Sequence, residues 1–167
     1  MDNKLLKQLY EQYYREIYLY VFSLCNSTQV SEDLTQETFL KALLSLKDSH
    51  ANMRAWLYTV ARNSYFNYRK KNERASSTEE IEETLSDKNA EEQLNKILDE
   101  ERSIMLQRAM RKLEQRYREV LTLQYFCGMS QREIGLIMKT SPDNIRVLAH
   151  RARQQLKKEL EEMGYDI

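Results

Sequence analysis

The scarcity of glycine and proline constrains the fold of this chain more than any other feature of its sequence. Its 167 residues include three glycines and one proline. Sheets joined by tight turns need many such residues, whereas helices joined by short connections need few. The sequence therefore predicts an all-α protein built of small helical domains, whose modest cores suit a hydrophobic fraction of 41%.

The charged residues divide the chain into three segments, although the formal net charge is zero. Residues 1–74 hold 11 Lys and Arg against 8 Asp and Glu, residues 75–97 hold 2 against 7, and residues 98–167 hold 13 against 11. The middle segment has almost no large apolar side chains, so it cannot bury enough surface to offset the entropy cost of ordering. We therefore expect two mildly basic domains, 1–74 and 98–167, joined by an acidic flexible linker, 75–97.

Metal, catalytic and membrane motifs are not found in the sequence. Cys25 and Cys127 stand in no CxxC motif and have no nearby histidine. The two histidines, His50 and His150, fall in separate domains, and there is no glycine-rich phosphate loop or nucleophile–base arrangement. The N-terminal residues lack a signal-peptide core, and no apolar run approaches membrane-spanning length. We expect a cytoplasmic protein that is not an enzyme, with no metal, no cofactor and no membrane insertion.

The N-terminal domain shows three helical segments. Apolar residues recur at steps of three and four along residues 5–21, which indicates an amphipathic helix. Ser31 is predicted to cap a second helix, with Glu32 and Asp33 in its first turn. After a polar loop, Lys47–Asn52, a third helix is predicted from about Met53 to Lys71. Its expected buried side consists of Leu57, Val60, Ala61, Tyr65 and Tyr68.

Two cap signals bracket a short turn in the C-terminal domain. Ser130 with Glu133 forms the S-x-x-E capping box that opens a helix. Ser141 followed by Pro142 opens another, as an N-cap followed by the residue favoured at the first helical position. The turn between these helices, Lys139–Thr140, has the length found in helix-turn-helix motifs, so the sequence predicts that motif.

The second helix of this motif is basic on one side. From Asn144 to Lys158 there are five Lys and Arg and no acid. Such a face suits a recognition helix that places side chains at base edges and phosphates in a major groove; the alternative is a basic helix that is merely solvated. The expected inward residues are Ile145, Leu148, Ala149, Ala152 and Leu156. The expected outward residues are Asn144, Arg146, Val147, His150, Arg151, Arg153 and Gln154.

The segment Met53–Arg74 interleaves six Lys and Arg with five aromatic side chains. That composition suits single-stranded nucleic acid, because phosphates pair with the cations and unstacked bases lie on the rings. A packed helix remains an equally open interpretation, since Trp56, Tyr65 and Tyr68 could belong to the core. The residues expected to share the outer face are Tyr58, Arg62, Asn63, Phe66 and Asn67.

These motifs, in this order around an acidic linker, resemble the extracytoplasmic-function (ECF) group of the sigma-70 family of bacterial RNA polymerase sigma factors. The resemblance covers nearly the whole chain. SEDLTQETFLKAL resembles the region that docks on the polymerase clamp helices, and RAWLYTVARNSYFNYRKK the region that melts and reads the minus-10 element. LEQRYREVLTLQYFCGMSQREIGLIMKTSPDNIRVLAHRARQQLKK resembles the minus-35 reader. The resemblance implies a sigma factor that directs transcription initiation, with region 2 in residues 1–74 and region 4 in residues 98–167.

The resemblance also implies partners and roles for matching residues. Core RNA polymerase, through its clamp helices and flap, and promoter DNA would be partners, and an anti-sigma factor is a third partner that it suggests. The polymerase-binding residues would be Asp33, Gln36, Glu37 and Phe39. The minus-10 DNA-binding residues would be Ser49, His50, Tyr58, Arg62, Asn63, Phe66, Asn67 and Lys70. The minus-35 DNA-binding residues would be Ser141, Asn144, Arg146, Val147, His150 and Arg151.

The recognition helix departs from the family pattern at two positions. Relatives usually carry a Ser-Arg pair where this chain has Val147 and Leu148, so one expected polar and one expected basic contact are absent. Asn67 stands where many relatives carry Asp. Two other functions stay open from the sequence: a helix-turn-helix regulator that acts without polymerase binding, and a helical adaptor that binds only proteins.

Overall fold

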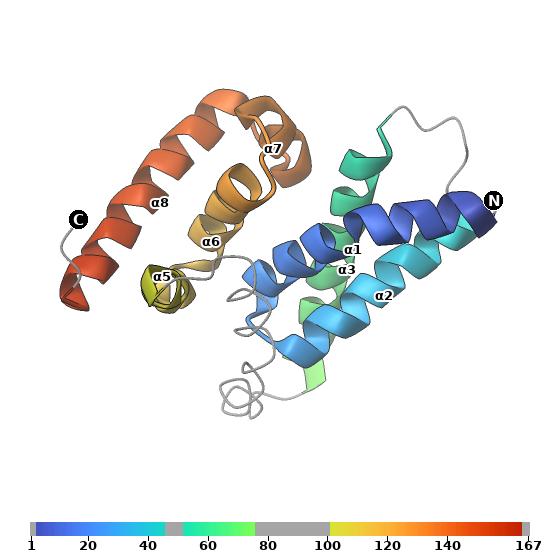
Figure 1. The fold of residues 1–167 in the computed structure, drawn as a ribbon, viewed down its shortest axis with the longest axis horizontal. Helices are drawn as coiled ribbons and strands as arrows, with labels where there is room; N and C mark the ends of the chain where they lie inside the picture. The colour runs from blue at the N-terminus through green and yellow to red at the C-terminus, as the bar shows by residue number, and fades with distance from the viewer. Residues whose placement is uncertain (1–2, 46–51, 76–100, 165–167) are drawn as a thin grey trace. The chain divides into compact units, whose positions relative to one another are not determined.

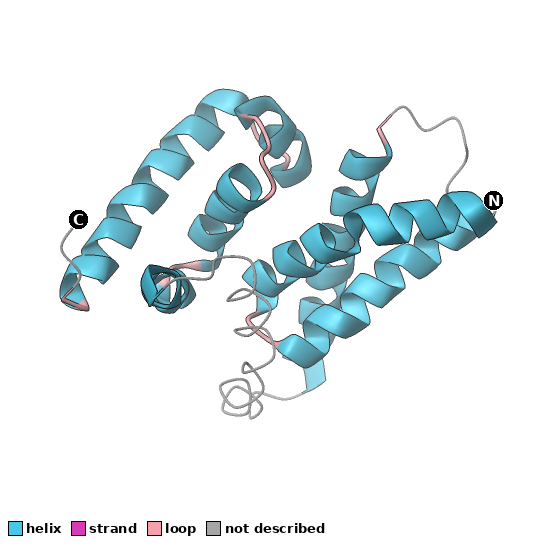
Figure 2. Ribbon diagram, viewed as in Figure 1, coloured by secondary structure: helices cyan, strands magenta, loops and turns pink. Residues whose placement is uncertain are grey.

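In the computed structural model, residues 3–45, 52–75 and 101–164 are described, and they form helices joined by short connections (Figure 2). The all-α class predicted from the sequence is therefore confirmed for these residues. The chain divides into two compact units, residues 1–83 and 84–167. Residues 76–97 of the predicted linker lie outside the described residues. The described helices lack the long apolar stretch that a membrane-spanning helix requires.

The described part of the N-terminal unit is a bundle of three helices, α1 (Asn3–Cys25), α2 (Thr28–Ser45) and α3 (Met53–Ala75). Each of the three packs on the other two (Figure 1). Their shared core holds large side chains with almost no exposed surface. Those of α1 and α3 include Ile17, Tyr20, Leu24, Leu57 and Tyr58. The predicted buried residues Ala61 and Tyr65 are confirmed, and Val60 and Tyr68 are half-buried.

Helix α2 begins three residues earlier than its predicted cap at Ser31. Asn26 adopts a left-handed conformation with φ of 54°, which turns the chain after α1. The hydroxyl of Ser27 then accepts an N–H from the first turn of α2 at 3.3 Å, so Ser27 serves as the cap. Ser31 lies inside the helix, fully buried, with its hydroxyl donating to the Ser27 carbonyl. The prediction was wrong because two cap-forming serines stand four residues apart, and the turn at Asn26 selects the first.

The buried side of α2 is rich in hydroxyl groups. Thr35 and Thr38 are fully buried, and each hydroxyl donates to the carbonyl four residues earlier, at 2.5 and 2.8 Å. These bonds satisfy the polar groups within the helix, so they can lie in the core without the penalty of a lost hydrogen bond. The small side chains let α2 pack closely on its neighbours, while several of its leucines remain on the outside.

The C-terminal unit contains α5 (Glu101–Lys112), α6 (Gln115–Leu121), the π-helix η2 (Thr122–Phe126), α7 (Gln131–Met138) and α8 (Pro142–Glu162). Helix α8 packs on α5, α6 and α7 (Figure 1). Gly128 follows η2 with φ of +65°, a conformation that glycine adopts without steric cost. The core of the unit includes Val120, Leu121, Leu123, Ile134, Ile137 and Ile145.

Candidate nucleic-acid interface

Hydrogen bonds fix the start of α7 and the beginning of the turn that follows it. Ser130 Oγ accepts from the Glu133 N–H at 3.2 Å, and the Glu133 carboxylate accepts from the Ser130 N–H at 3.2 Å, so the predicted capping box is confirmed. Helix α7 ends at Met138, and the next residue, Lys139, is left-handed with φ of 58°. The next N–H, of Thr140, donates to the Gly135 carbonyl at 2.9 Å. The chain therefore turns immediately after α7.

Gly135 allows the turn to pass close to α7 because it has no side chain. A Cβ atom at this position would lie 2.7 Å from the Thr140 carbonyl oxygen and 3.5 Å from the Pro142 nitrogen. Both neighbours are backbone atoms, which cannot move aside as a flexible side chain could. The packing of the turn against α7 therefore requires glycine here.

The first residues of α8 are also held in place. Ser141 Oγ accepts from the Asn144 N–H at 3.2 Å, and Pro142 is the first helical residue, so both predicted start signals are confirmed. The Asn144 amide donates to Thr140 Oγ1 at 2.9 Å. These bonds fix the N-terminal end of α8 relative to the turn. A recognition helix presents this end to DNA.

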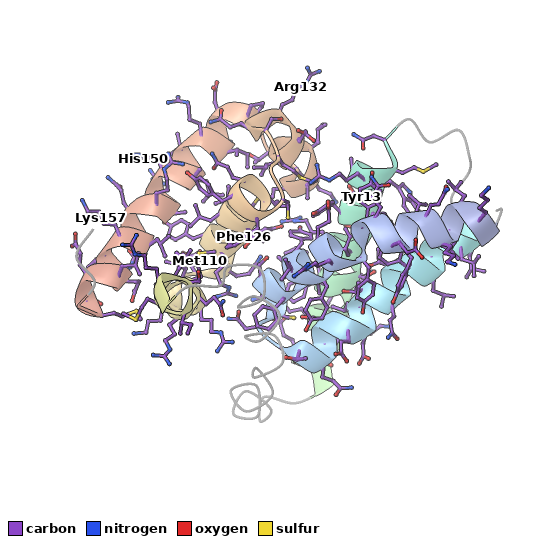
Figure 3. All side chains as sticks on the ribbon, in the orientation of Figure 1. Tyr13, Met110, Phe126, Arg132, His150 and Lys157 are labelled. Atoms are coloured by element: carbon purple, nitrogen blue, oxygen red, sulfur yellow. The ribbon has the colours of Figure 1, made fainter. Side chains whose placement is uncertain are left out.

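The outward side of α8 matches the prediction. Ile145, Ala149 and Ala152 are buried and Leu148 and Leu156 are half-buried. All seven residues predicted to face outward are exposed, together with Lys157 and Lys158 further along: Asn144, Arg146, Val147, His150, Arg151, Arg153 and Gln154. Figure 3 shows His150 and Lys157 projecting from α8. The exposed face is therefore cationic over four helical turns and suits a polyanion.

One contact of this face was not predicted from the sequence. Arg153 Nη1 donates to the Tyr125 hydroxyl at 3.4 Å, and both side chains are exposed. Tyr125 belongs to the π-helix η2, 28 residues earlier in the chain. The contact joins η2 to the basic face of α8, and no local sequence signal indicates it.

In the N-terminal unit, five residues predicted to bind the minus-10 element share one side of α3. Asn63, Asn67 and Lys70 are exposed, and Arg62 and Phe66 are half-buried. The Arg62 guanidinium carbon lies 4.6 Å from the centroid of the Phe66 ring, within cation–π range. This side of α3 combines a cation, a ring and amide groups, which are the components that bind phosphates and unstacked bases.

Tyr58 does not lie on this outer face, and that prediction was wrong. Its side chain is fully buried, its ring centroid lies 5.1 Å from that of Tyr20, and its hydroxyl donates to Glu16 Oε1 at 3.0 Å. The signal that could have placed it is its spacing: Tyr58 stands seven residues before Tyr65, and residues seven apart lie on the same side of a helix. The prediction had already assigned Tyr65 to the core.

The residues predicted to bind polymerase are divided between the surface and the core of the N-terminal unit. Asp33, Gln36 and Glu37 are exposed on α2, and Glu37 pairs with Lys41 at 3.2 Å. Phe39 is instead buried. The expectation that its side chain lies at an interface is therefore corrected, because its ring packs within the unit. It lies 5.2 Å from the Tyr10 ring centroid and 5.9 Å from that of Tyr14, both on α1.

Three exposed leucines of α2 were missed as candidate interface residues. Leu40, Leu43 and Leu44 lie on the same side of the helix as the exposed acidic residues, one to three turns further on, and Leu44 is 77% exposed. One sequence signal could have indicated that these leucines are exposed: the hydroxyl residues of α2 recur at helical spacing. They occupy the buried side of the helix, where leucines would otherwise lie. We call Asp33, Gln36, Glu37, Leu40, Leu43 and Leu44 the α2 surface.

Two tyrosines that lie between α1 and α2 have raised pKa values. Burial is the main cause of the raised pKa of Tyr14, followed by the neighbouring Tyr10 and the carboxylate of Glu32. Burial likewise raises the pKa of Tyr18 to about 12, and Glu32 adds to the increase. Both phenols are therefore neutral at physiological pH.

Two predicted minus-10 residues, Ser49 and His50, lie outside the described residues. Within the described ranges, no group of three or more His, Cys, Asp or Glu side chains is arranged to hold a metal ion.

The capped helices α7 and α8, the tight turn between them and the basic outer face of α8 define the C-terminal unit as a helix-turn-helix of the DNA-binding class.

Comparison with known proteins identifies the family. Residues 9–75 match Sigma-70 region 2, and residues 103–156 match Sigma-70, region 4. The chain is 32% identical over 162 residues to RNA polymerase sigma factor YlaC of Bacillus subtilis (strain 168), covering 93% of this chain and 91% of YlaC. It is 29% identical over 154 residues to ECF RNA polymerase sigma factor SigM of the same organism, covering 91% of this chain and 93% of SigM.

Solved structures show the same fold. The sigma factor RpoE of Bartonella quintana, in complex with the anti-sigma factor NepR, has a TM-score of 0.71 at 21% identity, covering 95% of this chain and 98% of RpoE. CnrH, in complex with the cytosolic domain of CnrY, has a TM-score of 0.67 at 22% identity, covering 96% of this chain and 90% of CnrH. The chain belongs to the sigma-70 family as an RNA polymerase sigma factor of the ECF group, which confirms the resemblance inferred from its motifs. Sigma factors are not enzymes.

Proposed function

We propose that this sigma factor binds core RNA polymerase through the α2 surface and binds promoter DNA at two elements. The outer side of α3 binds the non-template strand of the minus-10 element, and α8 enters the major groove of the minus-35 duplex. The observation that carries the proposal is the start of α8, where two cap hydrogen bonds position a helix with five cations and no acid between residues 144 and 158.

The α2 surface supports a protein partner. Its first half is acidic and its second half carries exposed leucines. Neighbouring exposed apolar side chains mark interaction sites more often than isolated ones do, and a helix with such a face can pack along a helical partner. We propose the polymerase clamp helices as that partner, with the flap as a second polymerase contact. Phe39 supports the surface from beneath through its packing on α1.

The outer side of α3 supports a single-stranded ligand. The Phe66 ring, covered in part by the Arg62 guanidinium, offers a stacking surface, and the exposed amides of Asn63 and Asn67 can hydrogen-bond to bases. Lys70 lies one turn beyond Phe66 and can pair with a phosphate. We propose that Ser49 and His50 act at the same element.

The exposed side chains at the start of α8 support duplex recognition. Arg146, His150 and Arg151 can donate hydrogen bonds to base edges or phosphates, and Ser141 and Asn144 flank the helix start, where they can contact the DNA backbone.

We also propose an anti-sigma factor as a regulatory partner, supported by the fold shared with RpoE, whose structure is a complex with the anti-sigma factor NepR.

Co-elution with purified core polymerase, followed by run-off transcription across a genomic fragment library, tests the proposal. The wild-type protein should co-elute and direct initiation at defined starts. A Leu40→Ser, Leu44→Ser double variant should lose co-elution, whereas Glu11→Ser, at an exposed position of α1, should keep it. DNA binding without co-elution would indicate a regulator that acts without polymerase. Protein binding that is insensitive to salt, with no DNA affinity, would indicate an adaptor.

A further inference from the structure

Val147 is an apolar side chain at the centre of the outward side of α8. It is 41% exposed, although both residues two positions away, Ile145 and Ala149, are fully buried. Because each residue advances an α-helix by about 100°, two residues rotate the side chain by about 200°. Val147 therefore points away from the core of the unit and lies on the side of α8 that is proposed to face DNA.

The surroundings of Val147 on this side are polar. The positions one helical turn before and after it are occupied by Asp143, Asn144, His150 and Arg151, all exposed, and the adjacent Arg146 is exposed as well. Leu148, the other apolar residue in this stretch, is half-buried and so is turned toward the interior. Val147 is thus a single apolar site within a surface of hydrogen-bonding and charged side chains.

The side chain of valine restricts what it can recognise. It has no donor or acceptor, so it makes no hydrogen bond to a base edge. As a β-branched residue in a helix, it is held close to one χ1 rotamer, so its methyl groups have a defined direction before any ligand binds. Placing it against an amino group or a carbonyl oxygen would remove water from that group without replacing the lost hydrogen bond.

We infer that Val147 reads the C5-methyl group of a thymine in the minus-35 element. This inference rests on the proposed docking of α8 in the major groove. Among the groups that base pairs display in that groove, the thymine methyl is the apolar one, and apolar side chains contact it. Val147 therefore favours a T·A pair at the position it faces and disfavours a cytosine, whose amino group would be desolvated there.

Selection of promoters by reconstituted holoenzyme tests this inference. From a promoter library with a randomised minus-35 region, sequences are selected separately with the wild-type protein, the Val147→Ala variant and the Leu136→Ala variant. Alanine has a higher helix propensity than valine, so the substitution at Val147 should not disturb α8. Leu136 is 73% exposed on α7 and serves as the matched control for removal of an exposed apolar side chain. Wild type and the Leu136 variant should select thymine at a position where the Val147 variant has no preference, with the other positions unchanged.

A second measurement removes only the methyl group. Replacing that thymidine by deoxyuridine should weaken wild-type holoenzyme binding about fourfold, the value expected for one buried methyl, and should leave the Val147 variant unaffected. Equal wild-type affinity for the two bases, or a thymine preference that survives in the Val147 variant, would overturn the inference. Failure of the wild-type holoenzyme to select any minus-35 sequence would instead contradict the proposed docking of α8, and the inference with it.

Discussion

Removal of the Glu16 carboxylate should destabilise the N-terminal unit substantially, because this group joins α1 to α3. Glu16 Oε1 accepts from Arg54 Nε at 2.6 Å and from the Tyr58 hydroxyl at 3.0 Å. The Glu16 and Arg54 side chains are 26% and 28% exposed, and Tyr58 is fully buried. Glu16→Ala deletes both contacts at once, and the buried hydroxyl loses its charged acceptor.

The expected loss follows from these two contacts. A hydrogen bond to a charged group contributes about 1.5–3 kcal/mol. A partly exposed ion pair contributes roughly 0.5–1 kcal/mol after solvent screening, and the better helix propensity of alanine returns a few tenths. We therefore expect Glu16→Ala to lower the free energy of unfolding by about 2–4 kcal/mol.

The chain offers a probe that reports on this unit alone. Trp56, its one tryptophan, lies in α3, so tryptophan fluorescence during urea denaturation follows the N-terminal unit. Glu11→Ala is the matched control, because Glu11 is an exposed glutamate of the same helix; its effect should stay within about 0.5 kcal/mol. A double-mutant cycle with Tyr58→Phe should give a coupling energy of about 1.5–3 kcal/mol. A Glu16 effect no larger than that of Glu11, or zero coupling, would refute the reasoning.

Four further outcomes are expected. Arg151→Ala should weaken holoenzyme binding to a promoter and reduce the slope of log affinity against log salt by about 1, and an unchanged slope would count against a phosphate contact. Asn63→Ala should reduce strand opening, measured by permanganate reactivity of unpaired thymines, more than duplex binding; equal losses would contradict its role. Gly135→Ala should destabilise the C-terminal unit by about 1–3 kcal/mol, because its Cβ would meet a backbone oxygen at 2.7 Å, and an unchanged thermal transition by circular dichroism would contradict this. The raised pKa of Tyr18 stabilises the folded unit fully below the ordinary tyrosine pKa of 10.0, and this stability is lost as the pH rises toward about 12, because the unfolded chain releases its proton first. The loss is at most about 3 kcal/mol before solvent screening, and Tyr18→Phe should remove it from the pH dependence measured by Trp56 fluorescence; an identical pH dependence would argue against the buried phenol.

The features that could be predicted from the sequence are those set by neighbours in the chain. The capping box at Ser130, the cap at Ser141 and the inward positions of α8 follow from interactions within one or two helical turns. The scarcity of glycine and proline indicated the helical class, and three motifs in order indicated the family. Each of these signals depends on spacing, which the sequence contains directly.

The exposed face of α2 could not be predicted in the same way. In α2, Thr35 and Thr38 occupy the core because their hydroxyls bond to the helix itself, and Leu40 and Leu44 are left outside, which reverses the usual hydrophobic pattern. Composition cannot distinguish this arrangement from its opposite, because the outcome depends on which side meets α1 and α3.

The aromatic and basic residues show the same division. Tyr58 was expected at the nucleic-acid surface and lies in the core, because Glu16, 42 residues earlier, supplies an acceptor for its hydroxyl. The Arg153–Tyr125 contact joins residues 28 positions apart. Short-range spacing thus determines where the helices begin, turn and end and which family they belong to. The side chains that remain available to polymerase and DNA are set by packing between distant segments, since burial is a property of the assembled bundle.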